Sequence, residues 1–256
     1  MQLASRLEAG ETLFTAWSGV PDALTVEIVA AQPFDAITLD MQHGGHHEDS
    51  VVRGILPVMH AKKHPVVRIP VGRFDMASRA LDFGAEAVIA PMVNSAADAR
   101  QFAAAMKYPP VGERSWGPTY AFPRHNGSDY NAWLGGMNAS TVSFAMIETR
   151  PALDALDGIL ETPGIDGIFV GPADFSIAWS SGAAVDGSLE DMMGTVASIA
   201  KRAREAGKHA AIYVVDPNMA GRFVSMGYRF MALGSEPRYI ALGAEALLKA
   251  ARGSMG

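Results

Sequence analysis

Short apolar runs alternate with longer amphipathic segments along most of the chain. The short runs favour β-structure and span residues 13–17, 36–39, 66–69, 87–90, 142–147, 167–170, 210–214 and 230–233. Between them, apolar residues recur with helical spacing, most clearly over 49–61, 76–83, 96–106, 189–206, 217–225 and 236–251. A strand pattern followed repeatedly by a helix pattern predicts parallel βα units, because parallel strands need a long crossover connection.

Eight such units in 256 residues predict the α/β class and a (β/α)8 TIM barrel, whose usual length is about 250 residues. We expect residues 1–256 to form a single barrel domain. Gly84, Gly207 and Gly227 each follow a helix pattern directly, as glycines that end helices do. Two stretches interrupt the alternation, residues 109–138 and 176–187, and both are predicted to be long loops.

Composition narrows the classes of function. The net charge of -6, with acidic and basic residues intermixed, favours a small-molecule partner over nucleic acid. The absence of cysteine excludes disulfides, a thiolate metal site and a cysteine nucleophile. Charged residues interrupt the N-terminal apolar stretch, so no signal peptide is predicted, and no segment predicts a membrane span. We therefore expect a cytoplasmic protein.

Two carboxylates follow neighbouring predicted strands, at the end of the barrel where such enzymes carry their active sites. Glu148 follows the strand over 142–147, and Asp174 comes shortly after the strand over 167–170. Their oxygens suit a hard divalent ion, with water and substrate oxygens completing its coordination. The alternative is that Glu148 or Asp174 caps the helix behind it.

His43 is a candidate general base, because it lies in a glycine-flanked turn after the second predicted strand. Asp40 is placed to orient it locally, whereas Asp82, late in a helix, would reach it only across a subunit or layer boundary. A carboxylate partner would raise the basicity of the imidazole. The neighbouring His46 and His47 are expected to be solvated.

Arg68 interrupts an apolar strand, where a guanidinium needs an anionic partner. That partner is either a substrate enolate oxygen or a carboxylate, Asp40 or Glu148. Further along, the backbone N–H groups of Gly171 and Ala173 are placed to bind a substrate carboxylate at a helix start.

The lysines bear on how a carbonyl group could be activated. They lie on predicted helices, just after helices or at the entry ends of strands, and are Lys62, Lys63, Lys107, Lys201, Lys208 and Lys249. None is expected at the barrel mouth, so an imine with a carbonyl substrate is disfavoured and a metal ion is expected to activate the carbonyl.

Several segments occur in the order and spacing of a known family. They include Ile37–Gly44, Pro65–Pro70, Ala90–Val93, Met146–Thr149 and Gly164–Phe175. Over nearly its whole length the chain resembles the 4-hydroxy-2-oxoheptanedioate aldolase family, whose relatives include 2-dehydro-3-deoxyglucarate aldolase. The resemblance implies a class II aldolase that makes or cleaves 4-hydroxy-2-oxo acids. The products of cleavage are an aldehyde and pyruvate, or a related 2-oxo acid such as hydroxypyruvate.

The resemblance also implies roles for residues. His43 matches the base, Arg68 the transition-state stabiliser, and Asp82 the residue that raises the basicity of the histidine. Ala173 matches a backbone contact to the substrate carboxylate.

Glu148 and Asp174 match the metal ligands, with Asp174 also beside the substrate. The resemblance implies Mg²⁺ or Mn²⁺ as the ion, with Co²⁺ or Zn²⁺ as alternatives. Members of the family tend to be hexamers, trimers of dimers, that exchange the last helix between neighbouring subunits. Residues 236–251 are therefore expected to pack on a partner.

The chain also departs from the family pattern. Met146 replaces a glutamine with which some members contact substrate, and residues 116–131 differ in a loop that shapes the aldehyde pocket. The acceptor aldehyde is therefore left open.

Two other functions stay open. One is a citrate-lyase-β-like lyase acting on acyl-CoA, although the arginine-rich nucleotide surface expected of it is not evident. The other is a non-catalytic barrel that serves as an assembly or ligand-binding module. That function gives no reason for His43, Arg68, Glu148 and Asp174 to share one rim.

Overall fold

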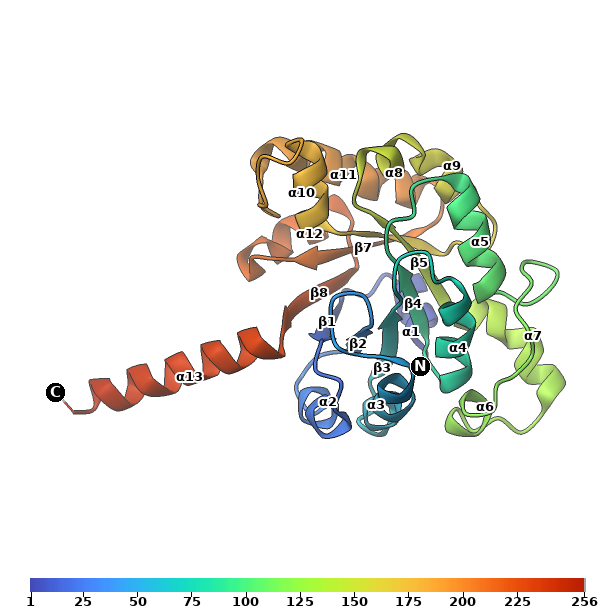
Figure 1. The fold of residues 1–256 in the computed structure, drawn as a ribbon, viewed down its shortest axis with the longest axis horizontal. Coiled ribbons are helices and arrows are strands. Elements are labelled where there is room, and N and C mark those ends of the chain that lie inside the picture. Colours follow the sequence, from blue (N-terminus) through green and yellow to red (C-terminus); the bar gives the residue numbers. More distant parts are fainter. Residues whose placement is uncertain (256) are drawn as a thin grey trace.

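The strands form a closed parallel barrel in the computed structural model, which describes residues 1–255. Each strand pairs with the next, and the last pairs with the first (Figure 1). The strands are β1 (Leu13–Ser18), β2 (Ala36–Asp40), β3 (His64–Arg68), β4 (Ala87–Ala90), β5 (Val142–Ile147), β6 (Gly167–Val170), β7 (His209–Val214) and β8 (Phe230–Ser235). The prediction of a (β/α)8 barrel is confirmed, since every predicted strand overlaps an observed one.

Six helical segments lie where the sequence predicts them. They are α3 (Glu48–His60), α4 (Asp75–Phe83), α5 (Ala96–Met106), α11 (Glu190–Glu205), the pair η1 (Pro217–Met219) and α12 (Ala220–Met226), and α13 (Glu236–Gly253). Gly84 and Gly227 follow α4 and α12 with φ of 114° and 111°, a left-handed conformation that glycine adopts without strain. The prediction that glycines end these helices is confirmed.

Other helices were not predicted. They are α1 (Leu3–Glu8), α2 (Ala23–Ala30), α6 (Ala121–Arg124), α7 (Tyr130–Ser140), α8 (Arg150–Asp154), α9 (Leu156–Leu160) and α10 (Pro172–Trp179). The two predicted long loops are therefore partly wrong, because 109–138 contains α6 and most of α7, and α10 extends into 176–187. Within residues 1–255 no helix has both the length and the apolar composition needed to cross a membrane.

Apolar side chains fill two concentric layers. Inside the barrel, Phe144 and Phe230 stack with ring centroids 5.6 Å apart, and Leu3 and Leu7 of α1 pack against this inner layer. The outer layer lies between the strands and the surrounding helices, and it includes Val67 beside the inward-facing Val66. Because both faces of each strand are buried, the strands read as nearly continuous apolar runs. A polar side chain at a strand end stands out against that background.

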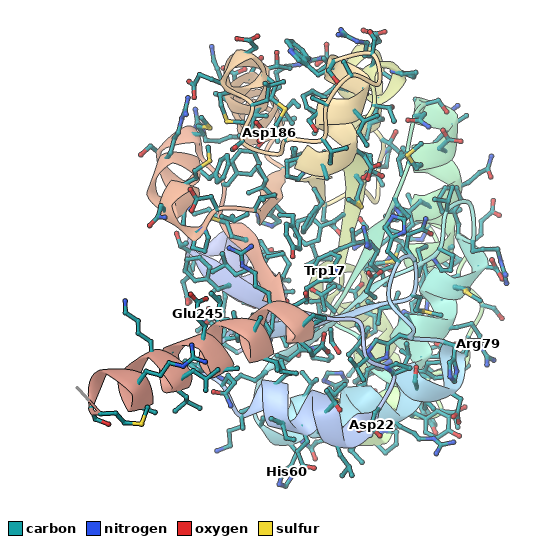
Figure 2. All side chains as sticks on the ribbon, turned by 60° about the vertical axis from the view of Figure 1, so that its left-hand side comes forward. Trp17, Asp22, His60, Arg79, Asp186 and Glu245 are labelled. Carbon is teal, nitrogen blue, oxygen red and sulfur yellow. The ribbon has the colours of Figure 1, made fainter. Side chains whose placement is uncertain are left out.

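The last helix, α13, leaves the barrel and extends away from it to the C-terminus (Figure 1). Its side chains beyond the first turn are exposed, including the apolar Ile240, Leu242, Leu247 and Leu248. Figure 2 shows Trp17 close to the base of α13 and Glu245 on the protruding part. An isolated helix with so much exposed apolar surface is unusual for a monomer.

Candidate active site

A cavity of about 200 Å³ opens at the C-terminal ends of the strands. Its walls are formed by Trp17, His43, Arg68, Met146, Glu148, Phe169, Gly171, Pro172, Ala173, Asp174, Tyr213 and Val215. Six of the predicted site residues therefore meet in one place. Asp40 lines an adjoining cavity together with His43 and Arg68, whereas Asp82 lines neither. The volume suits a small ligand, since sites for drug-sized molecules are typically about 300–1,000 Å³.

Arg68 forms a buried ion pair with Asp40 at the ends of β3 and β2. Its Nε donates to Oδ1 over 2.9 Å and its Nη2 donates to Oδ2 over 2.8 Å. Trp17 completes the arrangement, because its indole N–H donates to Asp40 over 3.1 Å and its ring lies 4.8 Å from the guanidinium. Burial acts to raise the pKa of Asp40, but the hydrogen bonds and charge of Arg68 outweigh burial and hold that pKa below its usual value. Of the two partners that the sequence leaves open for Arg68, the carboxylate is present.

This ion pair does not exclude a substrate contact. Arg68 uses Nε and Nη2 for Asp40, and its Nη1 has no hydrogen-bond partner among the described residues. Because Arg68 also lines the cavity, Asp40 fixes the plane of a guanidinium that keeps N–H groups for a ligand.

Asp40 also shapes the turn that carries His43. Its carboxylate accepts hydrogen bonds from the backbone N–H groups of Gln42, His43 and Gly44, over 2.9, 3.3 and 3.0 Å. A Cβ on Gly44 would overlap the carbonyl oxygen of Asp40 and crowd Gly19, so the turn requires glycine there. Asp40 therefore orients the backbone of this loop, and within residues 1–255 the imidazole of His43 has no hydrogen-bond partner. The ring is exposed and lines both cavities.

Asp82 lies near the end of α4, away from His43 of the same chain. Its Oδ1 accepts a hydrogen bond of 2.6 Å from Nη2 of Arg114. Burial raises the pKa of Asp82 even though Arg114 opposes the shift. The predicted contact with His43 across a subunit boundary is not tested within one chain.

Glu148 is a buried carboxylate at the end of β5. It is 2% exposed, and its Oε1 accepts a hydrogen bond of 2.7 Å from the backbone N–H of Met92. Met92 has a φ of 53°, which is strained for a residue with a side chain, and this conformation presents its N–H to the carboxylate. On the other side, a Cβ on Gly171 would overlap Oε2 of Glu148. The backbone is therefore shaped around this side chain.

The electrostatics of Glu148 favour a cation beside it. Burial raises the pKa of Glu148 to about 7; the charge of Asp174 adds to the rise, while the Met92 hydrogen bond and Arg68 oppose it. Asp174, in the first turn of α10, lies across the same cavity. Two carboxylates that repel each other in a partly apolar cavity match the hard oxygen ligands of a divalent ion. Among residues 1–255 no group of three or more metal-ligating side chains occurs, so water and ligand oxygens would supply the other positions.

The start of α10 borders the cavity on the same side. Pro172 is its first residue and has no N–H, whereas Gly171 and Ala173, which line the cavity, each have a backbone N–H. The binding of a substrate carboxylate by these two groups stays a prediction.

Sequence patterns did not identify several cavity residues. Trp17, Phe169, Tyr213 and Val215 are absent from the predicted site, and the first three lie on strands, where aromatic residues suggest core packing. In the sequence, only their positions near the ends of predicted strands indicated that they could belong to the site. The expectation that His46 is solvated is wrong, because His46 is 4% exposed and hydrogen-bonded through both ring nitrogens.

Comparison with known proteins gives consistent matches. Residues 13–241 match the family described as HpcH/HpaI aldolase/citrate lyase. The chain is 34% identical over 230 residues to a hydroxypyruvate/pyruvate aldolase of Roseovarius nubinhibens, covering 90% of this chain and 88% of that protein. It is 33% identical over 229 residues to a 2-keto-3-deoxy-L-rhamnonate aldolase of Escherichia coli, covering 90% and 85%.

Solved structures agree on the fold. An HpcH/HpaI aldolase from Desulfitobacterium hafniense superposes with a TM-score of 0.88 at 23% identity, over 98% of this chain and 97% of that one. A citrate synthase superposes with a TM-score of 0.86, also at 23% identity, over 99% and 98%. At this level of identity the likeness concerns the fold alone.

Proposed function

This chain belongs to the HpcH/HpaI aldolase/citrate lyase family, and on that basis we propose that it is a divalent-metal-dependent class II aldolase. It makes or cleaves 4-hydroxy-2-oxo acids, with pyruvate or hydroxypyruvate as the donor and an aldehyde as the acceptor. The observation that carries the proposal is the single cavity in which Glu148, Asp174, Arg68 and His43 meet. Relatives named as aldolases over most of their length support a carbon–carbon lyase.

Glu148 and Asp174 would hold the ion, with Mg²⁺ or Mn²⁺ the expected ions and Co²⁺ or Zn²⁺ the alternatives. When bound, such an ion supplies Lewis-acid polarisation of the substrate's 2-oxo group. The N–H groups of Gly171 and Ala173 bind the substrate carboxylate at the start of α10 and so fix the substrate relative to Asp174. The apolar wall of Met146 and Phe169 excludes water from one side of the cavity.

His43 acts as the base in this proposal. It takes a proton from the methyl carbon of pyruvate, and the electron pair of the broken C–H bond forms the enolate. The enolate carbon then forms a bond with the aldehyde carbon, and the aldehyde oxygen becomes the 4-hydroxyl group when it takes up a proton from solvent, to which His43 returns the proton that it removed. The N–H groups of Arg68 stabilise the developing negative charge on oxygen. Asp40 holds both His43, through its turn, and Arg68, through the ion pair.

The proposed role of Arg68 predicts two separable losses. Arg68→Ala should lower the rate of cleavage by roughly 10² or more, the usual cost of removing such a donor. It should also lower the free energy of unfolding by about 3–5 kcal/mol, because it leaves Asp40 buried without its partner. Arg68→Lys should regain part of the stability but little of the rate, because the ammonium group of lysine cannot reproduce the planar arrangement of donors in a guanidinium.

Steady-state kinetics and urea unfolding measure these two losses. Arg53→Ala is the matched control, because Arg53 is exposed on α3, forms its ion pair within that helix and lines neither cavity. Near-wild-type cleavage by Arg68→Ala would reduce Arg68 to a structural ion pair.

The proposed function as a whole is tested by enolisation of the donor. In deuterated water with Mn²⁺, the protein should exchange the methyl protons of pyruvate without any aldehyde, and NMR follows this exchange. A screen of aldehydes with pyruvate and with hydroxypyruvate then identifies donor and acceptor. Binding of pyruvate without exchange would favour a ligand-binding module, and exchange only with acyl-CoA thioesters would favour the citrate-lyase-like alternative.

The protruding helix supports a homo-oligomer, which we propose to be a hexamer built as a trimer of dimers. The apolar side chains of α13 and a groove between α2 and the base of α13 would be covered by other copies of the chain. In such an assembly, Asp82 of one copy would face His43 of another and raise its basicity.

A pair of substitutions in α13 tests the assembly. Ile240 and Leu247 are 70% and 75% exposed, and each apolar side chain of this size contributes about 1.5–3 kcal/mol when buried. The double variant Ile240→Asp/Leu247→Asp should therefore dissociate to smaller species in sedimentation velocity, while Glu245→Gln on the same helix should not. Wild-type protein that sediments as a monomer would contradict the proposal.

A further inference from the structure

Glu236 is a buried carboxylate at the base of an exposed helix. It is the first residue of α13 but is only 3% exposed. Its Oε1 accepts a hydrogen bond of 2.6 Å from the hydroxyl of Ser18, and its Oε2 accepts one of 2.9 Å from the backbone N–H of Gly19. The side chain is therefore used to hold the loop after β1. Neither the strand pattern nor the proposed reaction requires a buried carboxylate at position 236.

His46 continues this contact toward α3. Its Nε2 lies 3.0 Å from Oγ of Ser18, and its Nδ1 lies 3.2 Å from Oγ of Ser50. Burial lowers the pKa of His46 and the nearby His47 adds to the effect, while the charges of Glu236 and Asp40 act in the opposite direction. The net shift is downward, which favours the neutral ring with a single hydrogen.

The charge of Glu236 decides which ring nitrogen of His46 carries that hydrogen. A carboxylate can only accept, so the single hydroxyl hydrogen of Ser18 is directed to Glu236. The Oγ of Ser18 can then only accept from His46, which favours the Nε2–H tautomer and leaves Nδ1 to accept the hydroxyl hydrogen of Ser50, which also lies within reach of the carbonyl oxygen of His47. A glutamine at position 236 could donate instead and allow the opposite direction along the chain of hydrogen bonds.

Hydrogen bonds hold both ends of the loop that carries His43. Asp40 holds the start of this loop and His46 holds its end, and the N–H of Gly45 donates to the carbonyl of Gly19 over 2.7 Å. Glu236 and His43 also line one cavity of about 480 Å³. Ser18 and His46 therefore connect the base of α13 to the His43 loop by hydrogen bonds.

We propose that Glu236, acting through Ser18 and His46, is a positioning residue for His43. It ties the direction in which α13 leaves the barrel to the conformation of the loop after β2. This inference rests on the proposed function of His43 as the base. Glu236 itself does not contact the reacting atoms.

The test uses Glu236→Gln in the full-length protein, because it keeps the size of the side chain and removes its charge. We expect kcat for exchange of pyruvate methyl protons to fall about 10-fold to 100-fold, the usual result of a small misplacement of a catalytic group. The KM for pyruvate and the Kd for Mn²⁺ should change by less than about two-fold, because ground-state binding does not involve this network. Glu245→Gln, on the exposed part of α13, is the matched control and should leave all three constants unchanged (Figure 2).

A second variant and a second measurement keep the outcome unambiguous. Ser18→Ala breaks the network without replacing a residue of α13 and should reproduce the loss in kcat. It tests the inference by itself if Glu236→Gln does not fold. NMR of ¹⁵N-labelled histidine should show changed ring signals for His46 and His43 in both variants. Wild-type kcat and unchanged His43 signals in a folded variant would overturn the inference. If the wild-type protein exchanged no pyruvate protons, the proposed function would fail, while altered His43 signals would still support the link to Glu236.

Discussion

Removal of divalent metal should abolish cleavage of the carbon–carbon bond, and Mg²⁺ or Mn²⁺ should restore it. The reason is that no lysine lines the cavity to replace the ion by forming an imine with the 2-oxo acid. The most buried lysine, Lys107, donates to the carbonyl oxygens of Asn138 and Thr141, at the opposite end of β5 from Glu148. Activity after chelation and readdition of each ion measures the effect. A covalent adduct of pyruvate trapped by borohydride would contradict it.

Loss of either proposed metal ligand should abolish metal binding. Glu148→Ala and Asp174→Ala should each lose metal binding in isothermal titration calorimetry and lose activity with it, since two carboxylates supply all the protein ligands proposed. Circular dichroism should show an intact fold, because both residues lie at the rim of the barrel. Asp186→Asn is a control in the loop after α10, where the carboxylate of Asp186 accepts hydrogen bonds from the nearby Ser188 (Figure 2). Full metal affinity in either alanine variant would refute its assignment.

The raised pKa of Glu148 adds a dependence on pH. In the metal-free protein this pKa is about 7, against an ordinary value of 4.5, so the folded state holds a proton that the unfolded state releases. The resulting stability is present below pH 4.5 and is lost as the pH rises through about 7, a change on the order of 3 kcal/mol. Metal binding below pH 7 should therefore release up to one proton, and affinity should fall as the pH is lowered. Calorimetry in buffers of different ionisation enthalpy measures that proton.

The strands could be predicted from the sequence because both faces of each strand are buried. Apolar runs such as Ala87–Ala90 have no polar interruption, and glycines such as Gly84 mark where the preceding helix ends. Helices without a clear polar face were not predicted. α2 and α10 are short and mostly apolar, so the spacing of their apolar residues did not distinguish them from loops. The stretch 109–138 was read as a loop for another reason, its many glycines and prolines, although Asp129 caps α7 within it.

The site was predictable to the extent that polar residues interrupt apolar strand ends. Arg68 and Glu148 stand out in this way, but the choice of Asp40 as the partner of Arg68 depends on register, with Asp40 directly opposite Arg68 on neighbouring strands. The aromatic residues that line the cavity were not predictable, because the positions of Trp17 and Tyr213 on strands suggest core packing. The network of Glu236 and His46 joins residues far apart in sequence, which no local pattern reveals.

Replacement of His43 should lower the rate by about 10² to 10⁴, the range expected when a general base is lost. The side chain lies at the edge of the cavity, and its backbone is held by Asp40, so His43→Ala should leave the turn, the metal ligands and the Asp40–Arg68 pair in place. Binding of Mn²⁺ and pyruvate should therefore be mostly retained while kcat falls.

Exchange of pyruvate methyl protons, measured together with aldol cleavage, isolates the role of His43. Exchange without aldehyde requires only removal and return of the proton, so His43→Ala should lose exchange and cleavage to a similar degree. His60→Ala, an exposed histidine of α3 far from Trp17, is the matched control and should retain both rates (Figure 2). Exchange at the wild-type rate in His43→Ala would remove the base assignment. Loss of cleavage alone would instead place His43 at the aldehyde oxygen, where it would donate the proton that forms the 4-hydroxyl group.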